Sequence, residues 1–299
     1  MKKVLKNKAI VISFIIVVSL TLFSCLQYSI NNKKMVVYYE NLKENCRQNM
    51  ESKSNCDAIL QLEVPKLDTY TIFFSIVVDG PLRILCEFGP LFILIPAIWC
   101  LSKEMKNSFI KNYSLRDNYK NYLKHVLKSA YKCVWILPVV MIIVFVISCF
   151  LAKGNFNYFY ALEHSYSTFD EQYLSHFGLF FISFILNLLF FSIFYANLGL
   201  IYVKKNKSIV VAIIEAYLTF IGIEIVNEVI ITTFFYKILH IEIQYLLNIY
   251  DIYSYKYVFG IFPYLIVGFM CAFLSTLIVF FCYNNKEKTI IDCEMIKEV

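Results

Sequence analysis

The sequence of this 299-residue chain is poor in charged residues, glycine and proline. Asp, Glu, Lys and Arg make up only 17% of it, whereas soluble domains have about 25%, and apolar residues make up 59%. A soluble protein breaks up its apolar residues at helical or strand spacing, so that one face stays wet. Here the apolar runs are unbroken over about 20 residues, the length of helix that crosses a bilayer. The scarcity of charge therefore excludes a soluble globular protein.

The sequence also lacks the short motifs of nucleotide, metal and hydrolase chemistry. No G-x-x-x-x-G-K-[ST] is present, so the chain has no P-loop for ATP, and HExxH and GxSxG are absent. No CxxC occurs, and the four histidines are scattered. We therefore expect no catalytic residues, no metal and no cofactor, and the chain is not expected to be an enzyme.

Six apolar runs each predict a membrane-spanning helix, because lipid offers no hydrogen-bond partner to an unpaired backbone. They cover residues 9–30, 81–101, 133–152, 177–203, 209–236 and 257–283. The first run could also be read as a signal peptide with a lipobox-like stretch at 22–25. The run continues past Cys25, however, which favours an uncleaved span. The expected fold is an all-α, multi-pass protein of the cell membrane.

The positive charges indicate the orientation. The net charge is +6, and lysines gather before the first span, between the second and third, and between the fourth and fifth. Such segments stay in the cytoplasm, so both termini are predicted to be cytoplasmic. Because the charges follow this pattern, we expect them to meet membrane lipid and no nucleic acid.

The spans divide the chain into six predicted segments. These are the N-terminus with the first span (1–30), an extracellular segment (31–69), an outer apolar segment with the second span (70–101), a cytoplasmic amphipathic segment (102–132), spans three to six (133–283) and a cytoplasmic tail (284–299). Within the third segment, Asp79-Gly80-Pro81 predicts a helix start, which leaves residues 71–78 at the outer surface. Cys46 and Cys56 share the extracellular segment, where they could form a disulfide.

Residues 114–131 predict an amphipathic helix on the cytoplasmic membrane face. Apolar residues recur there at helical spacing, and basic residues form a ridge at intervals of four: Arg116, Lys120, Lys124, Lys128 and Lys132. Two interpretations stay open. The ridge can bind anionic lipid headgroups, or it can dock a cytoplasmic partner.

Ionisable residues within spans are costly and need a reason. The candidates are Asp79, Arg83 and Glu87 in the second span and Glu215, Glu224 and Glu228 in the fifth. The first three are spaced by four, so Arg83 can bond either carboxylate, which favours a structural ladder. Glu224 and Glu228 share a face without a basic residue nearby. They either line a substrate path or pair with Arg83. Gly268 and Ala272 form a small-xxx-small pair that indicates helix packing or a dimer.

The run from Glu104 to Asn112, with the residues that follow it, resembles the cytoplasmic segment between the second and third spans of type-2 ATP-binding-cassette (ABC) exporter permeases. The matching residues, in order, are Glu104, Asn107, Ser108, Ile110, Lys111, Asn112, Arg116, Tyr119 and Lys124. Six spans and an external segment after the first also fit that family. Two features depart from it: Ser108 stands where the family often has glycine, and the segment is shorter than usual.

The resemblance implies the permease subunit of an ATP-driven exporter. Its partners would be a second copy or a sister permease and two ATP-binding cassette ATPase subunits on separate chains. Glu104, Lys111, Arg116, Tyr119 and Lys124 would couple to the ATPase, and the cargo would be a peptide, drug or lipid. The alternative is a non-transporting membrane protein, such as an immunity or sensor protein whose external segment binds a peptide or toxin.

Overall fold

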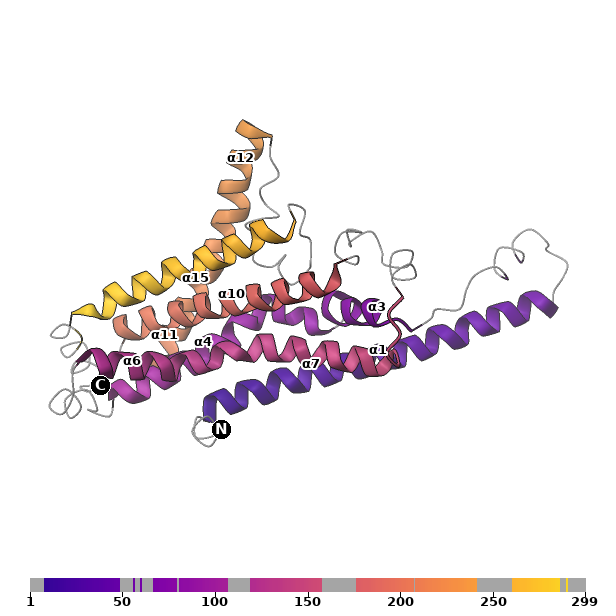
Figure 1. The fold of residues 1–299 in the computed structure, drawn as a ribbon, viewed down its shortest axis with the longest axis horizontal. Helices are drawn as coiled ribbons and strands as arrows, with labels where there is room; N and C mark the ends of the chain where they lie inside the picture. Colours follow the sequence, from indigo (N-terminus) through magenta and orange to yellow (C-terminus); the bar gives the residue numbers. More distant parts are fainter. Residues whose placement is uncertain are drawn as a thin grey trace. The chain divides into compact units, whose positions relative to one another are not determined.

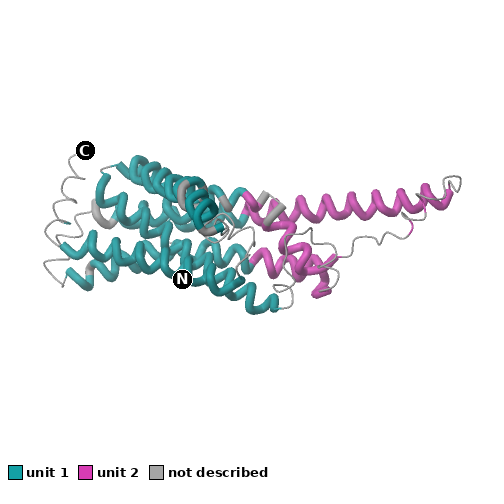
Figure 2. The backbone as a smooth tube through the Cα atoms, turned by 90° about the horizontal axis from the view of Figure 1, so that it is seen from above, with its two compact units in different colours: residues 1–18, 84–142, 176–299 teal, residues 19–83, 143–175 magenta. Residues whose placement is uncertain are grey.

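The computed structural model describes residues 8–48, 56, 60, 67–79, 81–106, 119–157, 176–206, 208–240, 260–285 and 289. Every regular element in these ranges is helical (Figure 1), as predicted for an all-α protein. The chain divides into two compact units (Figure 2). Unit 1 comprises residues 1–18, 84–142 and 176–299, and unit 2 comprises residues 19–83 and 143–175.

Four helical stretches of the described residues are long and apolar enough to cross a membrane. They are Lys8–Gln48, Tyr119–Leu151, Phe177–Lys205 and Ile261–Asn284, and they contain the predicted first, third, fourth and sixth spans. Large apolar side chains are exposed on them, among them Phe150 at 78% and Phe281 at 71%. Water does not tolerate extended apolar surface of this kind, so the chain is a helical membrane protein.

Helix α1 (Lys8–Gln48) is much longer than the span predicted within it. Its 41 residues extend over about 62 Å at 1.5 Å per residue, about twice the roughly 30 Å of a bilayer core. Neither glycine nor proline occurs between Asn31 and Gln48 to end the helix. The predicted first span and part of the predicted extracellular segment therefore form one continuous helix.

The predicted second and fifth spans are also helical. The 3₁₀ turn η2 (Pro81–Arg83) precedes α4 (Ile84–Lys106), so Pro81 stands in the first helical turn as expected. The fifth apolar run forms α11 (Ile209–Ile225), the π-helical segment η4 (Val226–Ile231) and α12 (Thr232–Leu239).

The lysine ridge lies on a helix that continues into the third span. α6 (Tyr119–Ala130) passes through the 3₁₀ segment η3 (Tyr131–Trp135) into α7 (Ile136–Leu151). The amphipathic helix is confirmed from Tyr119 onward, and residues 107–118 lie outside the described residues. α6 packs against α4, so part of its apolar face is covered by protein.

Unit 1 is built around α10 (Phe177–Lys205), which contacts α4, α11, η3 and α15 (Ile261–Asn284). α10 and α4 approach closely at Gly199, where an added Cβ would lie 2.9 Å from Ile98 Cγ1. A small residue at such a crossing lets two membrane helices pack backbone to backbone. This central helix also places the polar side chains described below.

In unit 2, α3 (Thr69–Phe74) and the π-helical η1 (Ser75–Asp79) carry the apolar residues expected at an outer surface. The structure buries them instead. Ile72, Phe73 and Ile76 are fully buried, and the Phe73 ring centroid lies 5.7 Å from that of Phe145 on α7. A segment that is apolar on most of its faces is stabilised by being covered on all of them, so it packs inside the unit.

Candidate functional site

The most unusual side chain in the apolar helices of unit 1 is Glu224. It lies near the end of α11 and is 2% exposed, and the π-helical η4 begins two residues later at Val226. π-helical turns inside α-helices are frequent at functional sites. A buried ionisable residue in a membrane helix is itself a marker of function. Glu228 lies in η4, and its side chain is outside the described part of the chain.

Glu224 and Asn187 approach α15 within one helical turn of each other. The Glu224 carboxylate interacts electrostatically with the thiol of Cys271. Three residues earlier, Gly268 lies against Asn187 of α10, so that an added Cβ would overlap the Asn187 Oδ1 and lie 3.3 Å from Phe191 Cε2. Residues three apart are neighbours on a helix surface. We call Asn187, Glu224 and Cys271 the polar cluster.

The polar cluster is buried and incompletely satisfied. Asn187 is 1% exposed, and among the described residues neither its Oδ1 nor its Nδ2 has a hydrogen-bond partner. A carboxylate accepts hydrogen bonds or a cation, and a carboxamide both donates and accepts. The pair could therefore bind a polar or cationic group passing between α10, α11 and α15. No group of three or more His, Cys, Asp or Glu side chains in the described ranges could hold a metal ion.

Glu215, the third carboxylate of the predicted fifth span, has a different environment. Its Oε2 accepts a 2.6 Å hydrogen bond from Nδ2 of Asn206, the residue that caps α10. Asn206 Nδ2 also donates to the Tyr202 carbonyl at 3.2 Å. Glu215 therefore fixes the turn between α10 and α11.

The predicted ladder of Asp79, Arg83 and Glu87 is only partly described. The side chains of Arg83 and Glu87 are exposed, and that of Asp79 lies outside the described residues. Glu87 takes part in unit 1 through its backbone, because its carbonyl accepts a 3.1 Å hydrogen bond from the Tyr217 hydroxyl. The interaction of Arg83 with either carboxylate stays a prediction.

Of the five predicted coupling residues, the structure describes the side chains of Tyr119 and Lys124. Glu104 lies in the last turn of α4 with its side chain outside the described part, and Lys111 and Arg116 lie outside it entirely. Lys124 is exposed on α6. The coupling role of all five stays a prediction.

Tyr119 joins α6 to the end of α15. Its hydroxyl donates to the Tyr283 carbonyl at 2.6 Å. Lys204, at the end of α10, donates to the Cys282 carbonyl, and its ammonium lies 5.1 Å from the Tyr283 ring centroid. Both side chains satisfy carbonyls that the helix end leaves without intrahelical partners. This closure fixes the ends of three helices.

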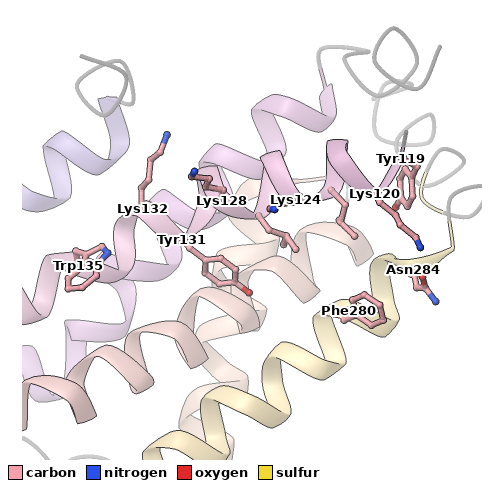
Figure 3. Close-up of a pocket in the computed structure, with 11 residues that line it drawn as sticks. Tyr119, Lys120, Lys124, Lys128, Tyr131, Lys132, Trp135, Phe280 and Asn284 are labelled. Atoms are coloured by element: carbon pink, nitrogen blue, oxygen red, sulfur yellow. The ribbon is translucent and has the colours of Figure 1, made fainter. Parts of the chain in front are cut away.

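A groove of about 1160 Å³ lies between α6, η3 and α15. Its rim carries the lysine ridge, Lys120, Lys124, Lys128 and Lys132, and its floor includes Leu123, Leu127, Trp135 and Phe280. Figure 3 shows Lys120 extending toward Asn284 of α15, while Lys132 points away from α15. We call this site the basic groove.

The predicted cysteine pair is brought together in unit 2. Both thiols are free, and Cys46 and Cys56 are joined by a side-chain hydrogen bond. This hydrogen bond raises the pKa of the Cys46 thiol. The two sulfur atoms are thus close enough to form the expected disulfide under oxidising conditions.

The sequence analysis missed three buried polar side chains that organise the structure: Asn187, Asn197 and Asp68. Asp68, 1% exposed, caps α3 by accepting from Thr71 N at 3.0 Å, and it also accepts from Asn157 N at 2.6 Å. Asn187 and Asn197 interrupt an apolar run, which is the one signal the sequence offered. Asp68 followed directly by a Thr-Tyr-Thr run is an N-cap signal that could have been read.

Comparison with known protein families, curated proteins and solved structures finds no match to this chain.

Proposed function

We propose that this chain is the membrane-embedded permease subunit of an ATP-driven exporter, with the ATPase on a separate chain. It crosses the cell membrane six times with both ends in the cytoplasm. Four described helices are long and apolar enough to do so. α4 has 23 residues, and α11 with η4 and α12 is longer still, so both exceed the roughly 20 residues of a span.

The observation that carries the proposal is the burial of Glu224 beside a π-helical segment. A protein that only anchors or senses has no need for a carboxylate inside its apolar bundle, whereas a transport path does. A π-helical turn also gives α11 a place where its backbone can change. α4 and α6 contact each other, as suits two helices joined by a coupling segment.

Purification of the tagged full-length chain from native membranes in mild detergent tests the partnership. We expect an ATP-binding subunit to co-purify and to be lost when Glu104→Lys and Arg116→Glu are combined. Lys237→Glu, a reversal at an exposed lysine of α12, is the matched control and should retain the subunit. A well-folded chain that brings down no ATP-binding subunit contradicts the proposal.

Two glutamines test the path within the intact complex. Glu224→Gln removes the charge of the polar cluster, so the coupled rate of ATP hydrolysis in lipid nanodiscs should fall about tenfold or more. Glu215→Gln is the control in the same helix, because its amide oxygen can still accept from Asn206. Equal rates for both variants and the wild type would remove Glu224 from the mechanism.

The cysteine pair tests the orientation. If residues 31–69 are outside, Cys46 and Cys56 should be bonded there. Maleimide-polyethylene glycol should then add to wild type and to the Cys46→Ser/Cys56→Ser variant equally often before reduction, and twice more to wild type after it. Two extra adducts before reduction would place the pair in a reducing compartment.

The alternative of an immunity or sensor protein is favoured by one observation. About half of α1 extends beyond the thickness of a bilayer core, and it carries exposed Met35, Val37 and Tyr38 that a peptide could contact. Protection against a peptide or toxin that persists after deletion of the ATPase partner supports this alternative over export.

A further inference from the structure

The basic groove concentrates positive charge without a protein counter-charge. Lys120, Lys124, Lys128 and Lys132 follow one another at intervals of four on a continuous helix, and no acidic side chain is among the described residues that line the groove. Like charges four residues apart on a helix repel each other. The arrangement therefore favours a bound anion.

The floor of the groove is apolar. Leu123 and Leu127 of α6 and Phe280 of α15 line it, and Phe280 is exposed. The volume of about 1160 Å³ lies above the roughly 300–1,000 Å³ of small-molecule sites. A small inorganic anion would leave most of this apolar surface uncovered, so the occupant needs an apolar part as well as a negative charge.

Two tyrosines bound the groove and set its length. Tyr119 bonds the Tyr283 carbonyl at one end, and Tyr131 bonds Asn197, which in turn bonds Ser275 of α15. The twelve residues between the tyrosines span about 18 Å of helix. One leaflet of the roughly 30 Å hydrocarbon core is about 15 Å deep. The groove thus matches the length of an acyl chain within one leaflet.

We propose that the basic groove binds one anionic phospholipid of the surrounding bilayer. The headgroup phosphate lies at Lys120 and Lys124, near the ends of α10 and α15. An acyl chain follows Leu127 and Phe280 toward Trp135, and Lys128 and Lys132 extend along the outer edge of the groove. Figure 3 shows Lys120 directed toward the Asn284 end, where this arrangement needs a headgroup contact. The proposal stands independently of the export function.

The chain contains a built-in reporter for this lipid. It has two tryptophans, Trp99 and Trp135, so Trp99→Phe leaves the groove tryptophan alone. In mixed micelles, phosphatidylglycerol with brominated acyl chains should quench Trp135 fluorescence at a concentration about tenfold lower than brominated phosphatidylcholine. Inorganic phosphate at millimolar concentration should not relieve the quenching, because the apolar contacts hold the lipid.

Charge-matched variants in the Trp99→Phe background locate the preference. Lys120→Gln/Lys124→Gln should abolish it, Lys120→Arg/Lys124→Arg should retain it, and Lys103→Gln/Lys237→Gln should leave it unchanged, because these exposed lysines lie outside the groove. Helical circular dichroism checks that each variant is folded. Equal quenching by the two lipids, or a preference that survives in Lys120→Gln/Lys124→Gln, overturns the proposal.

The same variants separate lipid from a protein partner. If the lipid preference is absent while co-purification of an ATP-binding subunit depends on Lys120 and Lys124, the groove is a protein docking surface and the lipid proposal fails. If no ATP-binding subunit co-purifies but the lipid preference holds, the export proposal fails and the lipid site stands.

Discussion

Two asparagines on α10 are buried to the same degree but have opposite surroundings. Asn197 accepts a hydrogen bond from the Tyr131 hydroxyl and donates to Ser275 Oγ at 2.9 Å and Thr276 Oγ1 at 3.0 Å. Asn187, ten residues earlier and about 15 Å along the helix, makes no hydrogen bond within the described residues. The comparison separates a structural region of α10 from one in which polar capacity is left unused.

The difference teaches how a polar group in an apolar bundle can be assigned a role. A satisfied carboxamide joins η3, α10 and α15 and so stabilises the packing. An unsatisfied buried carboxamide costs stability, so its presence beside Glu224 favours a functional explanation. The following experiments test whether the two asparagines really differ in this way.

The largest effect is expected for Asn197→Leu. Three interhelical hydrogen bonds are lost, and each contributes about 0.6–1.7 kcal/mol in a membrane protein. We expect the free energy of unfolding to fall by about 2–4 kcal/mol, measured by circular dichroism during titration with sodium dodecyl sulfate in mixed micelles. A loss below about 1 kcal/mol would show that Asn197 does not join the three helices.

The sequence predicted the helices better than it predicted these contacts. Apolar runs must become helices in lipid, so the positions of α4, α7, α10, α11 and α15 followed from composition. The extent of α1 and the continuity of α6 with α7 did not, because polar residues such as Asn31 and Lys132 are compatible with helix when glycine and proline are absent. Nor could a sequence show that Asn197 has partners and Asn187 has none, since that depends on which helices are neighbours.

A smaller loss is expected for Gly268→Ala. The added methyl group overlaps the Asn187 carboxamide, and overpacking of a buried contact costs about 1–3 kcal/mol. The double variant Gly268→Ala/Asn187→Ala should recover most of this loss, because the carboxamide that causes the overlap is gone. The same titration measures both. If the double variant is no more stable than Gly268→Ala, the close approach of α10 and α15 is not at Asn187.

Asn187→Leu is expected to act in the opposite direction to Asn197→Leu. Replacing an unsatisfied buried amide by an apolar side chain of similar size should raise the free energy of unfolding by about 1 kcal/mol. If the polar cluster serves transport, the same variant should lower the coupled rate of ATP hydrolysis in the intact complex. A variant that loses stability would show that Asn187 has a structural partner and would erase the contrast between the two asparagines.

The smallest effect is expected for Thr276→Val, which removes one of the two acceptors of Asn197 Nδ2. Ser275 Oγ remains at 2.9 Å, so the carboxamide keeps a partner. The loss should be about 0.6 kcal/mol, the average for one interhelical hydrogen bond in a membrane protein. Ser275→Ala should cost a similar amount, but the double variant should cost more than the sum of the two, because only then is the Nδ2 group left unsatisfied. A strictly additive pair would mean that Asn197 tolerates an unpaired amide as Asn187 does, and burial alone would then not distinguish the two regions.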